Sequence, residues 1–462
     1  MQIPIISGIY AETSADYRVA YPQNMRPVTK DTGISAGYLR PVDGIVSKGT
    51  GPGGSRGAIN WNGQHYRVMG SQLCRIAQDG TVTQLGDVGD DGRPVTLTYD
   101  FERLAIASNG DLFYYDATTL TQVTDTDLGT VIDVVWIDGY FMTTDGEFLV
   151  VTELNDPTAV SPLKYGSSEI DPDPIVSLVK QRNEIYAVNR YSIEVFDNLG
   201  GENFPFGRIE GAQVQRGAFG THCAVAYEGG VAFLGSGVGE SPGVFLAVKG
   251  GSEKVSTREI DTILSGYTES QLSTAVLEVL LNKGNTLLWI RLSDQTLVFD
   301  ITSSAAAGVP MWHIMTSGTG TPYRGIDAIW VYDDWWVGDI SSSDVGVLDD
   351  SLASHFGTTV PWEFSTIIIY GEGNGAVFHA IELVGLPGRQ APASDATITT
   401  SYSLDGVTWS TDRPLLLRGY DQRMVWRRQG NMRHYRIQRF QGDSTANLAV
   451  ARLEITLEGL AA

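Results

Sequence analysis

Hydrophobic and polar residues alternate along most of this chain in short runs, and tight polar turns separate the runs. The pattern is clear in RLAIASNGDLFYYDATTLTQVTD from Arg103 and in VVWIDGYFMTTDGEFLVVTEL from Val134. A two-residue period places successive side chains on opposite faces, which is typical of half-buried β-strands. The pattern therefore predicts a series of antiparallel hairpins between Gln64 and Asp350, without a long helix.

The turns between these strands carry dipeptides that tolerate positive φ, as tight hairpins require. They are Asp79-Gly80, Asn109-Gly110, Asp138-Gly139 and Asp145-Gly146. Further strand-turn-strand units begin near Ser177, His222, Asn285 and Gly325. Their spacing averages near the ~40–50 residues of a four-stranded propeller blade.

We therefore predict a β-propeller of about six or seven blades over residues 61–360. Two stacked β-sandwiches would also produce regular hairpins and are the alternative. Residues 1–60 are expected to form an extension that packs on the propeller. A helix is indicated at one place only, where Thr268 and Gln271 can form a capping box ahead of Leu272.

The pattern of predicted strands and turns changes beyond Pro361. Strands such as AVFHAIELVGL, ATITTSYSLDGVTWS and LAVARLEITLEG follow one another without the hairpin series of the preceding residues. This pattern predicts a separate β-sandwich, jelly-roll-like, over residues 361–462. The fold class is thus all-β, a propeller followed by a C-terminal sandwich.

The charge changes at the same place. Residues 361–462 contain ten Arg, no Lys and ten Asp or Glu, whereas the first 360 residues hold 22 basic and 44 acidic groups. The whole net charge of −22 therefore lies in the first 360 residues. Such an acidic body repels phosphate backbones, which disfavours DNA binding through a basic face. It would suit the wall of a conduit past which DNA slides, or it serves solubility alone.

Eight arginines occur close together near the C-terminus, and only Asp421 opposes them within that window. Arginine favours bidentate or stacked contacts, so we interpret this arginine cluster as a subunit or partner interface that pairs with acidic neighbours. A solvated face and a DNA contact are the alternatives. Alternation with Trp426, Tyr435 and Phe440 places much of the cluster on one strand face. The cluster comprises Arg413, Arg418, Arg423, Arg427, Arg428, Arg433, Arg436 and Arg439.

Signals for catalysis or metal binding are weak. The six histidines show no pair at ligand spacing, and the sequence indicates neither a metal nor a cofactor. Cys74 and Cys223 are expected to be buried thiols. The doublets Asp333-Asp334 and Asp349-Asp350 could form an acid/base pair, but adjacent strand residues point to opposite faces, so we expect no shared site. No apolar run is long enough to span a membrane, and the start of the chain lacks a secretion signal, so folding in a cytoplasm is expected.

One short motif, SLDGVTW from Ser403, resembles a hairpin of sugar-binding jelly rolls. Asp405 can bond turn amides, Gly406 can supply positive φ, and Trp409 can pack beneath. We interpret the motif as a structural hairpin, with a glycan site as the alternative.

Several longer motifs resemble the packaged-DNA stabilisation proteins of short-tailed bacteriophages, in the same order along the chain. The N-terminal stretches ADYRVAYPQNMRPV and GYLRPVDGIV, at residues 15–28 and 37–46, are similar to the start of that family. The others are VQRGAFGTHCAVAYEGGVAFLG at 214–235, REIDTILSGYTESQLSTAVLEVLL at 258–281, TLVFDITSS at 296–304, YRGID with VGD at 323–339, and RMVWRRQGNMR at 423–433.

The resemblance implies a virion tail protein, a hub or nozzle that forms a hexameric ring below the portal and its adaptor proteins. It implies closure of the DNA exit channel, stabilisation of the packaged genome and a place in the ejection conduit. Tailspike, tail fibre or tail needle proteins would be further partners, and double-stranded DNA would pass without sequence-specific binding. Before assembly the protein would reside in the host cytoplasm. The alternative is a glycan-binding or glycan-hydrolysing propeller with a carbohydrate-binding jelly roll.

Overall fold

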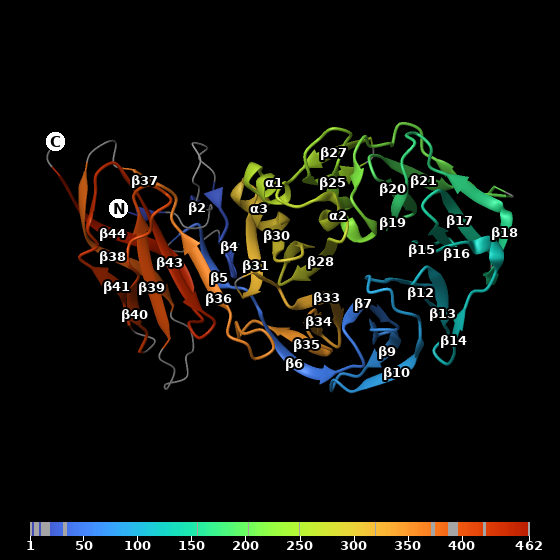
Figure 1. Cartoon of the computed structure of the whole chain (residues 1–462), viewed down its shortest axis with the longest axis horizontal. Helices are drawn as coiled ribbons and strands as arrows, with labels where there is room; N and C mark the ends of the chain where they lie inside the picture. Colours follow the sequence, from blue (N-terminus) through green and yellow to red (C-terminus); the bar gives the residue numbers. More distant parts are fainter. Residues whose placement is uncertain are drawn as a thin grey trace.

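A computed structural model provides the structure of the chain. It describes residues 2–3, 9–10, 19–30, 35–154, 156–201, 203–248, 250–318, 320–370, 375–386, 396–418 and 422–460. Two bodies lie side by side: a ring of small sheets, and a two-sheet sandwich that holds most of the C-terminal residues (Figure 1). The predicted all-β class is confirmed.

The ring consists of seven antiparallel sheets and is a seven-bladed β-propeller. Blade 1 contains β7 (Ser55–Trp61), β8 (Gln64–Met69), β9 (Gln72–Ile76) and β10 (Val82–Asp87). Blade 2 contains β11 (Thr96–Tyr99), β12 (Leu104–Ser108), β13 (Asp111–Tyr115) and β14 (Leu120–Gln122). Blade 3 contains β15 (Asp133–Ile137), β16 (Tyr140–Thr144), β17 (Phe148–Glu153) and β18 (Asp156–Ser167). Blade 4 contains β19 (Ile175–Gln181), β20 (Glu184–Asn189), β21 (Ile193–Asn198) and β22 (Phe206–Arg208).

The remaining blades have the same plan. Blade 5 contains β23 (Gly217–Ala218), β24 (Ala224–Tyr227), β25 (Gly230–Ser236), β26 (Gly243–Val248) and β27 (Gly251–Lys254). Blade 6 contains β28 (Val276–Asn282), β29 (Asn285–Arg291), β30 (Thr296–Asp300), β31 (Trp312–Gly318) and β32 (Thr321–Pro322). Blade 7 contains β33 (Gly325–Val331), β34 (Asp334–Asp339), β35 (Asp344–Asp349) and, from far upstream, β6 (Gly44–Thr50).

Strand β6 closes the propeller. It pairs antiparallel with β35, so blade 7 is built from two segments about 300 residues apart. Ile45 of β6 is 1% exposed and packs in the core with Tyr323 and Val337. Gly49 lies against the turn of blade 1, where an added Cβ would meet the carbonyl oxygen of Gly80 at 2.1 Å. A side chain at this position would therefore push the closing strand away from blade 1.

The second body is a β-sandwich of two antiparallel sheets. One sheet has the order β4 (Met25–Thr29), β5 (Gly37–Pro41), β44 (Ala449–Gly459), β38 (Ala376–Leu386) and β41 (Met424–Arg427), with β1 (Gln2–Ile3) and β42 (Asn431–Met432) beside it. The other has the order β36 (Pro361–Ser365), β43 (Tyr435–Asp443), β39 (Thr397–Ser403) and β40 (Arg413–Leu416), with β37 (Ile369–Tyr370) paired to β43. The short strands β2 (Ile9–Tyr10) and β3 (Val19–Ala20) pair with each other. Phe364, Phe378, Trp426 and Phe440 are buried between the two sheets.

This topology differs from the expectation that residues 1–60 form an extension packing on the propeller. Strands β4 and β5 belong to the sandwich, whereas β6 and β7 are propeller strands. The reason is hydrophobic: Met25 and Leu39 are fully buried in the sandwich core, next to residues of the C-terminal strands. The N-terminal segment therefore belongs to both bodies.

Asn24 joins the two bodies through a set of buried hydrogen bonds. Its amide nitrogen Nδ2 donates to the carbonyl oxygen of Pro361 at 2.7 Å, and its Oδ1 accepts from the backbone N–H of Thr316 at 2.8 Å. Its own N–H donates to the carbonyl oxygen of Ile314 at 2.8 Å, and neighbouring Gln23 exchanges two backbone bonds with Glu363. Asn24 has φ of 54°, a conformation that Asn tolerates better than most residues. One side chain thus ties blade 6 to the first strand of the second sandwich sheet.

The predicted capping box is present, and the helix it begins is α2 (Glu269–Leu272), a single turn. The expectation of only one helix was wrong, because α1 (Arg258–Leu264) and α3 (Ile301–Ala307) also form. Each has seven residues, too few for a periodic hydrophobic pattern to stand out. Their N-caps, Thr257 and Asp300, accept hydrogen bonds from backbone N–H groups in the first turn.

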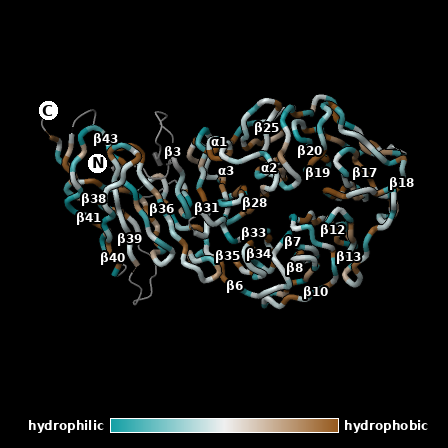
Figure 2. Tube along the Cα trace, viewed as in Figure 1, coloured by the Kyte–Doolittle hydropathy of each residue, from teal (hydrophilic) through white to brown (hydrophobic). Residues whose placement is uncertain are grey.

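The predicted turns and thiols are confirmed. Gly80, Gly110, Gly139 and Gly146 all have positive φ between paired strands, and Cys74 and Cys223 are free and buried. Colouring by hydropathy shows apolar stretches along the strands and polar stretches at many of the turns, as alternation predicts (Figure 2).

Candidate assembly surfaces

The arginine cluster is divided among several positions on the sandwich. Arg413 lies on β40, Arg427 ends β41, and Arg436 and Arg439 lie on β43, whereas Arg418, Arg423, Arg428 and Arg433 lie beside strands. Strands β40 and β43 belong to one sheet and β41 to the other. The expectation that much of the cluster forms one strand face was therefore wrong. Alternation within short segments cannot show that the segments enter different sheets.

Arg436 is fully buried and has a structural role. Its guanidinium donates to Oε1 of Gln438 at 2.7 and 3.0 Å and to the carbonyl oxygen of Gln429 at 2.5 Å. The guanidinium carbon also lies 4.4 Å from the ring centre of Phe378 and 3.9 Å from that of Tyr402. Burial lowers the pKa of Arg436 to about 10. This side chain is unavailable for an interface.

Three more arginines have partners within the chain. Arg423 forms a bidentate ion pair with Glu382, and this pairing lowers the pKa of the carboxyl group. Arg439 stacks 4.2 Å from the ring centre of Trp409. Arg413 donates to the carbonyl oxygen of Arg428. The guanidinium groups of these three arginines are therefore engaged within the chain, whereas the sequence analysis assigned them to a partner.

The other four arginines are exposed: Arg418, Arg427, Arg428 and Arg433. Within the described residues their side chains have no hydrogen-bond or ion-pair partner. Arg428 lies just beyond β41 with φ of 56°. Asp421, the one acidic residue of the window, lies outside the described residues.

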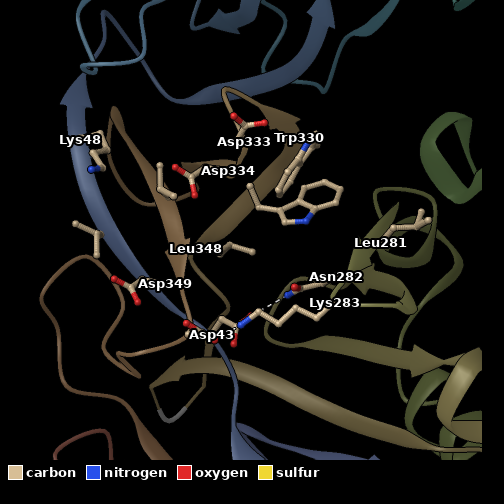
Figure 3. A pocket seen from close by; sticks show the side chains of 14 residues that line it. Asp43, Lys48, Leu281, Asn282, Lys283, Trp330, Asp333, Asp334, Leu348 and Asp349 are labelled. Carbon is tan, nitrogen blue, oxygen red and sulfur yellow. Dashed lines mark hydrogen bonds and ion pairs between the residues drawn. The ribbon is translucent and has the colours of Figure 1, made fainter. Parts of the chain in front are cut away.

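On the propeller, blade 7 and the β28–β29 turn of blade 6 enclose a hollow of about 670 Å³ (Figure 3). We call it the acidic hollow. It is lined by five carboxylates, by Trp330 and Trp335, and by two lysines. The carboxylates are Asp43, Asp333, Asp334, Asp349 and Asp350; the lysines are Lys48 and Lys283.

The tryptophans form a cross-strand pair with ring centres 5.7 Å apart, and Trp330 is 49% exposed. The turn that joins their strands has two successive residues at positive φ, Tyr332 at 56° and Asp333 at 63°. Such a turn breaks the alternation of a regular strand. All four side chains of the two aspartate doublets line this one hollow.

Some of the carboxylates are neutralised locally. Asp43 pairs with Arg40 at 2.9 Å and accepts from Asn282 at 2.8 Å, and Asp350 pairs with Lys283. In the described part of the chain, Asp333 and Asp334 have no such partner. The hollow therefore retains a net negative charge at its tryptophan end.

A second charged group is buried where blades 1, 6 and 7 meet, with its residues on β8, β28, β29 and β33. Asp327 lies 3.7 Å from the guanidinium of Arg67 and 3.8 Å from that of Arg291, and its N–H donates to Glu278 at 2.7 Å. Burial raises the pKa of Glu278 to about 7, against the opposing effect of Arg291, and lowers the pKa of Arg67 to about 10. We interpret this group as a link between blades 6, 7 and 1.

The SLDGVTW segment forms a hairpin whose polar groups satisfy one another. Asp405 accepts from the N–H groups of Val407 and Thr408, and Gly406 has φ of 77°. Trp409 packs under Arg439. These contacts are the ones expected if the motif is a structural hairpin.

Among the described residues, no three or more His, Cys, Asp and Glu side chains come together in a way that could hold a metal ion. In the same part of the chain, no helix is both long and apolar enough to cross a membrane.

The fold therefore defines a class of protein: a seven-bladed propeller tied to a β-sandwich by its own N-terminal strands. A family model described as the β-propeller of bacteriophage P22 Gp10 matches residues 1–353, and a second, described as its β-sandwich, matches residues 361–458. The chain belongs to the bacteriophage P22 Gp10 family.

A relative in this family is the tail hub protein gp10 of Salmonella phage P22. It is 28% identical over 458 residues, which cover 94% of each chain. Among solved structures, the Pan2 WD40 domain of Neurospora crassa has a TM-score of 0.43 at 10% identity and covers 66% of this chain and 95% of its own. The N-terminal domain of Nup159 has a TM-score of 0.42 at 7% identity and covers 71% and 98%.

Proposed function

We propose that this protein is a structural tail hub of a phage virion. Six copies would form a ring below the portal and its adaptor proteins, close the DNA exit channel, stabilise the packaged genome and form part of the ejection conduit. The observation that carries the proposal is the match of both bodies, in order, to the propeller and sandwich of one tail hub family. The ring would in turn carry tailspike, tail fibre or tail needle proteins.

The charge distribution supports a passive conduit. The first 360 residues hold 44 acidic against 22 basic groups. Phosphate backbones are repelled by such a body, and attraction between DNA and a basic wall would hinder movement. Double-stranded DNA would therefore pass the ring without sequence-specific binding. The role requires no turnover, so we propose no catalytic residue and no cofactor.

The exposed arginines are the residues we assign to assembly. A closed ring repeats one contact around its axis, so an interface of ordinary size, ~800 Å² on each side, gains stability from closure. Arg418, Arg427, Arg428 and Arg433 supply exposed positive charge on a chain that is otherwise strongly acidic. They would meet acidic surface on a neighbouring subunit or on an adaptor protein.

The test is to locate the chain in particles. Cryo-electron microscopy of DNA-filled particles from the phage that encodes it should show six copies around the tail axis, next to the portal complex. Particles that contain the chain elsewhere, or that lack it, would refute the proposed function.

Charge reversal tests the arginine assignment. Arg427→Glu with Arg428→Glu should strongly reduce incorporation into particles, while the monomer keeps its fold because both side chains are exposed. A control with the same charge change reverses two exposed propeller arginines, Arg75 and Arg182. Equal incorporation of both variants would count against an interface at Arg427 and Arg428.

A further inference from the structure

The acidic hollow has an exposed aromatic ring beside carboxylates that are unpaired among the described residues, and together these two features favour binding of one type of side chain. Trp330 offers a half-exposed indole, and Asp333 and Asp334 beside it lack ion-pair partners among the described residues. Aromatic faces attract cations, and a planar guanidinium can stack on an indole while it donates two parallel bonds to a carboxylate. A lysine ammonium would use only part of this arrangement. The hollow therefore fits arginine side chains.

Exposed arginines without partners occur on the other body of the same chain. Arg427 is the last residue of β41, in the sandwich sheet that also contains β38 and β44, and Arg428 follows it. In Figure 1, β41 lies at the outer end of the sandwich, well separated from β33, β34 and β35 around the hollow. The two surfaces are complementary in charge but lie on different parts of the molecule, so a contact between them would join two chains.

We propose that the acidic hollow receives Arg427 and Arg428 of a second copy of this chain. The proposal rests on the proposed function and specifies its subunit contact. A contact between two different surfaces is head-to-tail, and it generates a ring if the rotation per subunit closes. Stacking on Trp330 and pairing with Asp333 and Asp334 would hold the arginines.

Cross-linking in assembled particles tests the contact directly. One chain would carry Asp334→Cys and a differently tagged chain Arg428→Cys, so that only neighbouring copies can be linked by a short bifunctional thiol reagent. The native thiols Cys74 and Cys223 are buried. The control pairs Arg428→Cys with Leu163→Cys, an exposed position on β18 in blade 3.

We expect a mixed-tag dimer from Asp334→Cys with Arg428→Cys, in about tenfold excess over the control pair. Particles with an intact ring but no such dimer would overturn the inference and leave the tail hub function standing. A cross-link from Asp334→Cys to a different virion protein would also overturn it, because the occupant would then be another partner. Failure of the unmodified chain to form a ring would overturn both proposals.

Charge exchange provides an independent test. Asp333→Arg with Asp334→Arg should weaken self-association by about a hundredfold, and Arg427→Asp with Arg428→Asp should do the same. A mixture of the two variants should associate better than either alone, because each supplies the complement of the other at one contact. A mixture no better than the single variants would contradict direct pairing.

Discussion

At the scale of single residues, burial decides what an arginine does. Arg436 and Arg433 are three positions apart, yet Arg436 is fully buried between Phe378 and Tyr402 and Arg433 is exposed. A buried guanidinium must be hydrogen-bonded throughout, whereas an exposed one remains hydrated. The same residue type therefore serves the core in one case and is free for a partner in the other.

Replacement of Arg436 should therefore be costly. Arg436→Ala leaves Gln438 and the carbonyl oxygen of Gln429 without their donor and opens space beside two rings, and we expect a loss of about 3 kcal/mol in the free energy of unfolding. Arg433→Ala should change it by no more than ~0.5 kcal/mol. Urea denaturation followed by tryptophan fluorescence would measure both. Equal losses would contradict the structural role of Arg436.

Glu278 should make stability depend on pH. Its pKa is about 7 in the folded protein against an ordinary 4.5, so the folded state binds more protons than the unfolded state between these values. Stability should therefore fall as pH rises through this range, and Glu278→Gln should remove that part of the dependence. Parallel stability curves for the two proteins between about pH 5 and pH 8 would contradict this assignment.

At the scale of elements, the hairpins could be predicted but their partners could not. The dipeptides Asn109-Gly110 and Asp138-Gly139 predict turns on their own, because both of their residues readily adopt positive φ. Strand β6 pairs with β35 across most of the chain, and no local pattern identifies that partner. For the same reason, the sequence did not predict that Asn24 connects the two bodies. Nor did it predict the acidic hollow, because the lining residues come from three separate segments of the chain.

Substitutions in β6, the strand that closes the propeller, should lower the stability of the fold. Ile45 is buried where β6 completes blade 7, so Ile45→Ala should lower the free energy of unfolding by about 3 kcal/mol. Ser47→Ala, at an exposed position on the same strand, should have little effect. Chemical denaturation of both variants tests this, and an unchanged midpoint for Ile45→Ala would contradict closure by β6.

At the scale of the whole molecule, the N-terminal segment connects the propeller and the sandwich, because it contributes strands to both. The net acidic charge lies in the first 360 residues, and the four exposed arginines of the cluster lie on the sandwich. In the proposed ring, this separation of charge would favour contacts between copies over contacts with DNA.

The most direct measurement uses DNA-filled particles assembled without this protein. Purified chain would be added, and bound copies per particle and the rate of genome loss would be recorded together. We predict binding at six copies per particle and a marked decrease in DNA leakage. No binding with unchanged leakage would contradict the stabilising role and would bring the glycan-binding alternative forward.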